Sequence, residues 1–180
     1  VTDHQSVHVH GQYHSQPTAS TQLTESWWQF SPLPIAGYRV KARVGWFYPK
    51  LSLENTDIGW TSPYSSSFSM INSWFAEELR AQAAELNVGN KLGAWQWQAV
   101  AAVHRANDPI GSLLSWRGFA MHNSQTGIGE RVPFARYPSL NVPPLSLQPA
   151  WVEPTREVDG KLGYYVGLHG QWQDRLEVRG

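Results

Sequence analysis

The sequence predicts an all-β protein, namely part of an antiparallel up-and-down transmembrane β-barrel with long outer loops and a short helix in one loop. Three observations lead to this prediction. Several stretches alternate between apolar and polar residues with a period of two, as strands lying between two different solvents do. The connections between these stretches alternate between tight turns and long segments, and aromatic residues gather beside the tight turns.

Residues 38–47 (YRVKARVGWF) show the alternation most clearly. One face of this strand would carry Tyr38, Val40, Ala42, Val44 and Trp46, and the other would carry Arg39, Lys41 and Arg43. Three cations on one face cannot lie in a dry core, so that face has to be hydrated. Taken alone, the stretch fits a core-facing strand of a soluble sheet as well as a barrel strand with lipid on one side.

The other full strands are expected, in chain order, over residues 6–14, 22–30, 77–87, 95–105 and 162–172, and a partial strand begins at residue 176. Helix propensity favours a helix over 77–87. The alternation of Leu79, Ala81 and Ala83 against Glu78, Arg80 and Gln82 favours a strand. We assign a strand, because a tight turn at 88–93 would pair it with 95–105 as a hairpin.

The connections between strands are of two kinds. Tight turns are expected at 31–37, 88–93 and 173–175, and long loops over about 48–77 and 106–161. Outer-membrane barrels combine short periplasmic turns with long outer loops in this way. The aromatic residues beside the tight turns, which would form one girdle, are Trp28, Phe30, Trp95, Trp97 and Trp172. Within the first long loop, Met70, Ile71, Trp74 and Phe75 recur at helical spacing and predict the short helix.

Composition excludes several classes of function. The formal net charge is zero, which gives no electrostatic basis for nucleic-acid binding, and the absence of cysteine excludes disulfides and thiol catalysis. The longest purely apolar run, 99–103, is far shorter than the roughly 20 residues of a transmembrane helix, so the chain could span a membrane only as a closed barrel. The chain starts at Val1 without a signal segment and ends in an incipient strand. We therefore expect a single partial barrel domain over 1–180, cut at both ends.

The middle of the chain carries a series of short motifs. They are SLEN at 52–55, GWTSPY at 59–64, INSW at 71–74, EELR at 77–80, NDP at 107–109 and SWRG at 115–118. In this order they resemble a poorly characterised family of Gram-negative outer-membrane proteins, porin-like barrels distantly similar to phosphate-selective porins. The resemblance covers about residues 20–175. It implies a barrel fold and a bacterial outer-membrane location, and it transfers no site residues.

In such a barrel the polar face of the strands would line the pore. The predicted pore-lining residues are Glu25, Arg39, Lys41, Arg43, Arg80, Gln82, Gln96, Gln98 and His169. The four cations among them form a basic stripe, and rings of Arg and Lys favour anions, unless nearby glutamates merely balance them. We expect a channel for passive diffusion of small solutes with a slight preference for anions, embedded in a lipid bilayer. Neither enzymatic activity nor a cofactor is expected, and a homo-oligomer is left open.

Two further groups of residues invite a functional interpretation. The apolar side chains of Trp60, Tyr64, Trp74 and Phe75 need a surface to pack on, so loop 48–77 is expected either to constrict the lumen or to cap the outer rim. His8 and His10 share one strand face, and such a pair can bind zinc or copper when a third ligand joins it. A polar lumen face that uses histidine is the simpler interpretation of this pair.

Two other classes of protein remain as alternatives. Ten tryptophans also suit a secreted carbohydrate-binding β-sandwich, and the histidine-rich strand also suits a metal-dependent periplasmic enzyme. A glycoside hydrolase is less well supported, because the adjacent Glu77 and Glu78 would point to opposite faces of a strand. The sequence contains neither a nucleophile-elbow motif nor a zincin motif.

Overall fold

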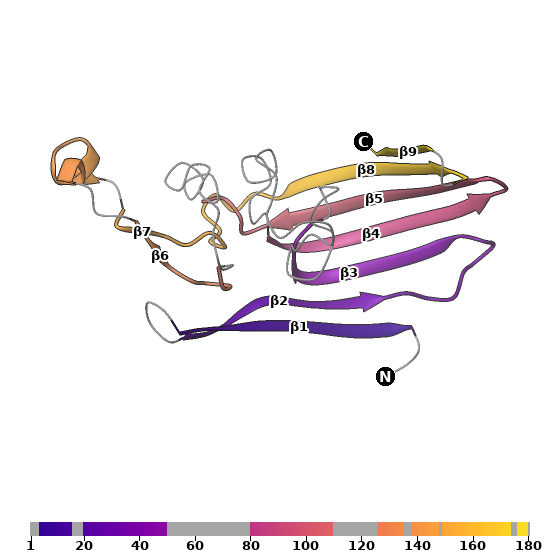
Figure 1. Ribbon diagram of the computed structural model, residues 1–180, viewed down its shortest axis with the longest axis horizontal. Coiled ribbons are helices and arrows are strands. Elements are labelled where there is room, and N and C mark those ends of the chain that lie inside the picture. Colours follow the sequence, from indigo (N-terminus) through magenta and orange to yellow (C-terminus); the bar gives the residue numbers. More distant parts are fainter. Residues whose placement is uncertain are drawn as a thin grey trace.

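The computed structural model describes residues 4–15, 20–49, 80–109, 126–134, 138–147, 149–173 and 176–179. These residues form one seven-stranded antiparallel sheet and one small two-stranded sheet, with almost no helix (Figure 1). The all-β prediction is therefore confirmed. The large sheet has the order β1-β2-β3-β4-β5-β8-β9, which follows the chain. Strands β1 and β9 are its two edges, so the described part of the sheet is open and is not a closed barrel.

The strands of the large sheet are long. They are β1 (Gln5–His14), β2 (Ser20–Phe30), β3 (Arg39–Phe47), β4 (Ala81–Leu92), β5 (Trp95–Arg105), β8 (Gly163–Trp172) and the short edge strand β9 (Leu176–Arg179). Five of the six predicted full strands agree with these bounds to within a few residues. The sixth was placed too early, because the chain turns at residues 93–94 and not over 88–93. Gly93, with a φ of 62°, takes the left-handed conformation that this two-residue turn requires.

The two ends of the sheet differ as predicted. At one end, β4 and β5 are joined by residues 93–94 and β8 and β9 by residues 173–175, and we call this the short-turn end. At the other, the long-loop end, β3 and β4 are connected by residues 48–80 and β5 and β8 by residues 106–162 (Figure 1). This difference between the two ends comes from the connections after β3. At the start of the chain it is reversed, because the β1–β2 connection (15–19) is shorter than the β2–β3 connection (31–38).

The second long connection contains a small structured unit. Strands β6 (Val132–Pro133) and β7 (Trp151–Val152) pair with each other, and two 3-10 turns, η2 (Pro138–Asn141) and η3 (Leu145–Leu147), lie between them. The unit extends past the long-loop end of the large sheet (Figure 1). Phe134 and Val152 form its small buried cluster. The helix predicted between residues 48 and 76 lies outside the described residues.

None of the helices among the residues that the structure describes is both long and apolar enough to cross a membrane.

Gly45 allows β2 and β3 to approach each other closely. Its φ is 141°, and a Cβ atom there would lie 2.2 Å from the Ser26 carbonyl oxygen and 2.6 Å from the Trp27 Cα. Both contacts are with backbone, which cannot turn aside as a flexible side chain would.

We therefore expect Gly45→Ala to destabilise the protein by about 1–3 kcal/mol through strain and through loss of β2–β3 pairing. Equilibrium unfolding monitored by tryptophan fluorescence measures this. Gly170→Ala is the matched control, because a Cβ at Gly170 meets no atom within 4 Å. Equal stability of the two variants would contradict the observed register.

Candidate functional site

The register of the sheet divides its side chains between two faces. Residues directly opposite each other in an antiparallel pair point to the same side, so the pairing assigns a face to every strand position. One side, the apolar face, carries Val7 and Val9 of β1, Trp28 of β2, Ala42 and Val44 of β3, Ala84, Leu86 and Val88 of β4, Ala99, Ala101 and Val103 of β5, and Tyr164, Val166 and Leu168 of β8. The other side, the polar face, carries histidine, glutamine, arginine and glutamate.

The exposure of these two faces is the reverse of that in a soluble protein. On the apolar face Val7 is 73% exposed, Val166 75% and Tyr164 81%. On the polar face Glu25 is only 6% exposed and Glu85 8%. A soluble monomer rarely exposes one apolar patch of more than roughly 300–600 Å², yet here aliphatic side chains line one face across six neighbouring strands.

Aromatic residues lie in three pairs along the apolar face. Trp28 and Phe30 stack with ring centroids 6.2 Å apart, Tyr38 and Trp97 meet edge to face at 6.2 Å, and Trp95 and Trp172 lie 6.4 Å apart. All six belong to strand positions that point to the apolar face or continue its alternation. The five aromatic residues predicted to form one girdle therefore share the apolar face but not one level of the sheet, because Trp95 lies opposite Trp172 beside the turns whereas Phe30 lies opposite Ala42, on the level of Val166.

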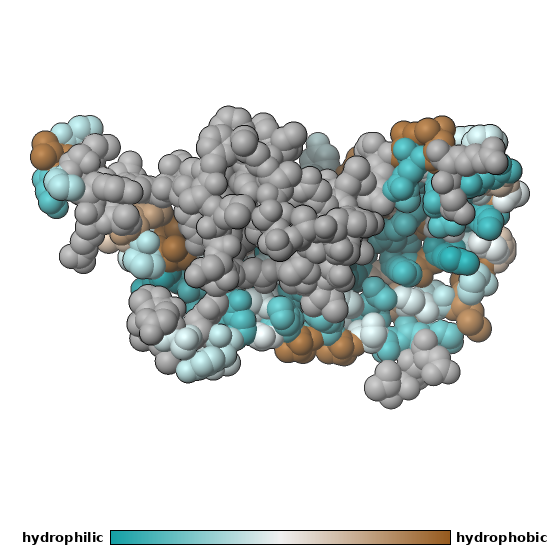
Figure 2. Space-filling model, in the orientation of Figure 1, coloured by the Kyte–Doolittle hydropathy of each residue, from teal (hydrophilic) through white to brown (hydrophobic). Residues whose placement is uncertain are grey.

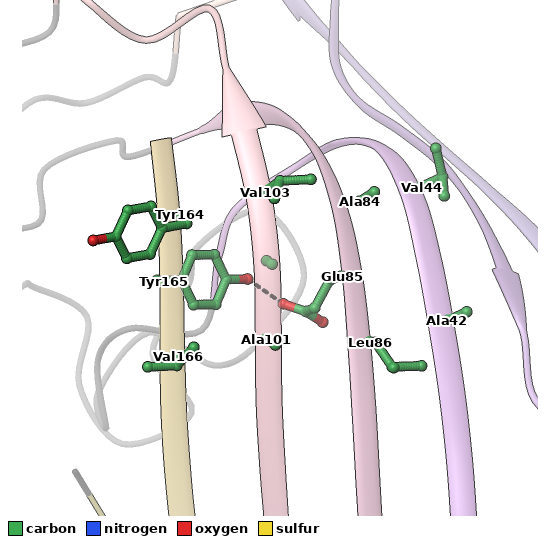
Figure 3. Close-up of a pocket in the computed structure, with 11 residues that line it drawn as sticks. Ala42, Val44, Ala84, Glu85, Leu86, Ala101, Val103, Tyr164, Tyr165 and Val166 are labelled. Atoms are coloured by element: carbon green, nitrogen blue, oxygen red, sulfur yellow. Dashed lines mark hydrogen bonds between the residues drawn. The ribbon is translucent and has the colours of Figure 1, made fainter. Parts of the chain in front are cut away.

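A shallow hollow lies in the middle of the apolar face (Figure 3). Alanines form its floor, at positions 42, 84 and 101, and the larger side chains of Val44, Leu86, Val103 and Val166 stand around them. Substrate pockets combine apolar walls with a few convergent polar groups. Glu85 and Tyr165 lie nearby but bond to each other on the polar side of the sheet, so the hollow offers no such groups.

A transverse row of contacts crosses the polar face from β1 to β8. The His8 ring stacks on Trp27 at a centroid distance of 4.7 Å. The Arg43 guanidinium lies 5.5 Å from the Trp27 ring and 3.7 Å from the Phe47 ring. Arg43 Nη2 donates to Glu85 Oε1 at 2.9 Å.

The row continues to β8 because a small alanine side chain on the intervening strand β5 leaves space above it. Ala102 of β5 lies between Glu85 and Tyr165 in the register, and its small side chain lets the Tyr165 hydroxyl reach across β5. That hydroxyl donates to Glu85 Oε2 (Figure 3). Glu85 thus accepts from Arg43 with one oxygen and from Tyr165 with the other, and Asn87 Nδ2 adds a third bond at 2.8 Å to the first oxygen. A carboxylate buried with this many donors is held in one geometry.

The polar face between the row and the short-turn end is open to solvent. Arg39, Lys41 and Lys91 are exposed there. On the side of the molecule seen in Figure 2, hydrophilic residues gather over the short-turn ends of β3, β4, β5 and β8. The residues opposite Arg39 and Lys41 are Gly89 and Asn87, which carry no charge.

The polar face between the row and the long-loop end is buried. Arg80 is 2% exposed, and its Nη1 donates to the Thr24 carbonyl oxygen at 2.9 Å and to the Tyr48 hydroxyl at 3.4 Å. Thr24 is the extra residue of a bulge in β2, and its hydroxyl donates to the His10 carbonyl oxygen at 2.9 Å. This end is a structural anchor that ties β1, β2, β3 and the start of β4 together.

The structure brings most of the predicted pore-lining residues to the polar face. These are Glu25, Arg39, Lys41, Arg43, Gln96, Gln98 and His169. Gln82 is an exception, because it faces Trp46 and belongs with Ala84 and Leu86 on the apolar side, where Arg105 Nε donates to it at 2.7 Å. The prediction that the Gln82 side chain points to the polar, pore-lining face was wrong. The alanines at 81, 83 and 84 fit either face, whereas Glu85 and Asn87 lie on the polar face and Leu86 and Val88 on the apolar one.

Arg80 also departs from its predicted place. It precedes β4 and lies in the buried anchor, away from Arg39 and Lys41, so the predicted stripe of four cations is split into three environments. Sequence reasoning missed Trp27, Glu85, Tyr165 and Lys91 on the polar face. The period of two could have found Tyr165 and Trp27, since each alternates with a residue of the apolar face. The constriction candidates Trp60, Tyr64, Trp74 and Phe75 lie outside the described residues.

The two histidines proposed as metal ligands have other partners. His8 Nε2 lies 3.7 Å from Glu25 Oε2, and His10 Nδ1 lies 2.8 Å from the Thr24 hydroxyl oxygen. The two rings are 6.4 Å apart, and the described residues bring no third ligand to them. Within the described part of the chain, the group whose geometry suits a cation is Asp108, Glu157 and Asp159.

That acidic group is used by the backbone around it. Asp108 Oδ2 accepts from the Val158 amide at 2.7 Å, and this bond lowers the pKa of the Asp108 carboxyl. Glu157 accepts from the amides of Ala106 and Gly160 at 2.9 and 2.7 Å. These bonds close the connection between β5 and β8, which is a sufficient structural role for the carboxylates.

Comparison with family models, with curated proteins and with solved structures finds no match to this chain. The resemblance to porin-like barrels therefore stays a prediction.

Proposed function

We propose that this chain forms part of the wall of a transmembrane β-barrel in a bacterial outer membrane, and that the barrel is a passive channel for small solutes. The observation that carries the proposal is the reversed exposure of the two sheet faces. A sheet that exposes valine, leucine and tyrosine across six strands while it buries glutamate and arginine is stable when the medium outside is apolar and the enclosed side is polar.

The dimensions of the apolar face support the proposal. Strands β1, β2, β4, β5 and β8 have 10 to 12 residues, and membrane-spanning strands need about 9–11. From Trp95 to Val103 along β5, and from Tyr164 to Trp172 along β8, the apolar stretch measures roughly 27 Å at about 3.4 Å per residue. Tilted by about 40°, it spans roughly 21 Å, close to the apolar band of about 25 Å in outer-membrane barrels.

The aromatic group supports the same orientation. Trp95, Trp97 and Trp172 lie at the short-turn end, where the periplasmic interface of such barrels is found. In a membrane the open edges β1 and β9 need partner strands, because a strand edge in hydrocarbon leaves amides and carbonyls without hydrogen bonds. Further strands, from this polypeptide or from another copy, have to pair with both edges in the membrane.

Membrane embedding can be tested with single cysteines, because the chain has none of its own. A fluorophore on Val166→Cys should be quenched by brominated lipids, whereas the same fluorophore on Gln98→Cys should be quenched by aqueous iodide. These residues point to opposite faces, and Gln98 is three residues, or about 10 Å, along β5 from Ala101, the residue opposite Val166. A sheet that is soluble would give quenching by iodide at both positions. The channel itself is tested by stepwise conductance of the full chain in planar bilayers.

The alternative of a carbohydrate-binding β-sandwich is favoured by one observation, the exposed tryptophans on a flat sheet face. Trp95 is 51% exposed and Trp28 39%. A sandwich needs a second sheet against the apolar face, and in the described part of the chain the other sheet has two short strands and extends past the end of the first (Figure 1). Solubility of the full chain without detergent, with binding to glycans lost on Trp95→Ala, would favour the sandwich.

A further inference from the structure

We propose that Arg39 and Lys41, and not Arg43, make the channel selective for small anions, and that their binding region is the open half of the polar face beside the short turns. This inference rests on the proposed function and names the class of solute that it admits. The three cations alternate along a single strand and would be equivalent in sequence. In the folded protein, however, the three cations have different surroundings.

The charge of Arg43 is compensated by a neighbouring carboxylate and attracts a solute ion only weakly. Its side chain is 12% exposed, its guanidinium is 3.7 Å from the Phe47 ring, and it forms a 2.9 Å ion pair with Glu85, whose side chain is 6% exposed. A compensated pair acts on a distant ion as a dipole, so its field falls off faster than that of a single charge. The pair also stands in the transverse row, where both charges are held in place by Trp27 and Tyr165.

Arg39 and Lys41 are in the opposite situation. Both are exposed, and the residues opposite them in the register, Gly89 and Asn87, are uncharged. Asn87 in turn faces Val100, and Gly89 faces Gln98, so the neutral surroundings extend across β4 to β5. Within the described residues neither cation has an ion-pair partner. Lys91 adds a third exposed cation on the same face at the end of β4.

Among the described residues, the remaining carboxylates of the polar face are too distant to cancel these charges. Glu177 lies on β9, four strands away from β3, or about 19 Å at about 4.8 Å per strand, and it forms an ion pair with His169. Glu25 lies beyond the level of Trp46, which is about 17 Å along the strand from Lys41. Both distances exceed the Debye length of about 8–10 Å at physiological ionic strength, so the described residues create a positive field near Arg39 and Lys41.

The chemistry of this region fits a small anion with carboxylate or phosphate oxygens. Arginine offers a planar fork of donors and lysine a point charge. Amide groups lie on the same face two strands away, since Gln96 and Gln98 of β5 are exposed there and Gln98 Nε2 donates to Asn87 Oδ1 at 2.7 Å. Exposed cations with neutral donors bind an anion weakly and release it again, as conduction requires.

The test is the reversal potential of the full chain in planar bilayers under a KCl gradient. Replacing both Arg39 and Lys41 by glutamine is expected to lower the chloride-to-potassium permeability ratio by a factor of roughly 2–5 at about 0.1 M salt, with a smaller change at 1 M. The control is Arg156→Gln with Lys161→Gln, which removes the same formal charge from exposed residues outside the large sheet, where Lys161 Nζ lies 3.5 Å from Asp159 Oδ2. Arg43→Gln with Glu85→Gln should leave the ratio unchanged.

The readout comes only from channels that fold and conduct, so a variant that folds poorly does not mimic a change in selectivity. An unchanged ratio in the Arg39 and Lys41 variant, or an equal fall in the Arg156 and Lys161 control, overturns this inference and leaves the channel in place. A fall in the Arg43 and Glu85 variant shows that the paired arginine sets selectivity and also overturns it. Absence of conductance in the unmodified chain overturns the proposed function itself.

Discussion

Val166→Arg is expected to destabilise the membrane-embedded protein by about 2–4 kcal/mol. Val166 is 75% exposed on the apolar face, between Gly163 at the long-loop end of β8 and Trp172 at its short-turn end, and it shares its level with Ala101, Leu86 and Ala42. A guanidinium at that depth would leave water for hydrocarbon. The measurement is equilibrium unfolding from lipid vesicles in denaturant.

The control for this prediction is Gln98→Arg, an equal increase in charge at an exposed position of the polar face. It should change the free energy of unfolding by no more than about 0.5 kcal/mol, as a hydrated surface substitution does. In a soluble sheet an arginine at an exposed valine would also cost little. Only a membrane-embedded sheet therefore predicts a large difference in stability between the two variants. Equal and small effects of both variants would rule out lipid contact at Val166.

Arg43→Ala is expected to destabilise the protein by about 3–5 kcal/mol, which is the usual effect of removing one partner from a buried ion pair. The remaining Glu85 carboxylate would be almost fully buried, with only Tyr165 and Asn87 as donors. Glu85→Ala should be comparably damaging, because it leaves the Arg43 charge buried between Trp27 and Phe47. Both values are obtained from equilibrium unfolding in vesicles or detergent.

The double variant Arg43→Met with Glu85→Met separates the ion pair from simple packing. Removing both charges while keeping side-chain volume should recover most of the lost stability. Tyr165→Phe, which removes one donor to Glu85, should cost about 1–2 kcal/mol alone and much less in the double variant. Additive effects of Arg43→Ala and Glu85→Ala would show that the two residues do not interact in the folded protein.

The strands and their approximate positions could be predicted because alternation is a local property. The stretches 38–47, 95–105 and 162–172 each carry enough contrast between apolar and polar residues to define two faces without knowledge of their neighbours. The prediction failed at the start of β4, where alanines occupy both faces and the contrast is weak. Gln82 was assigned to the wrong side, because the alternation of Leu79, Ala81 and Ala83 has the opposite phase to that of Leu86 and Val88.

The candidate site was less predictable than the strands. Arg39, Lys41 and Arg43 are indistinguishable in sequence because they repeat at the same spacing on one strand. Ala102 looks like an unremarkable small residue, yet its size lets Tyr165 reach Glu85 across β5. Arg80 continues the alternation of its segment, but it precedes β4 and is bonded to Thr24 and Tyr48. Each of these outcomes depends on contacts between strands.

Long two-sided strands follow from the amino-acid sequence alone, because side chains alternate on an extended backbone whatever the rest of the chain does. The positions of Trp95 and Trp172 beside short turns follow from it too, since they flank the turn residues in the chain. Which charges are paired depends on the folded sheet. Pairing depends on the register between strands distant in sequence, and that register neutralises Arg43 with Glu85 while it sets Arg39 and Lys41 beside glycine and asparagine.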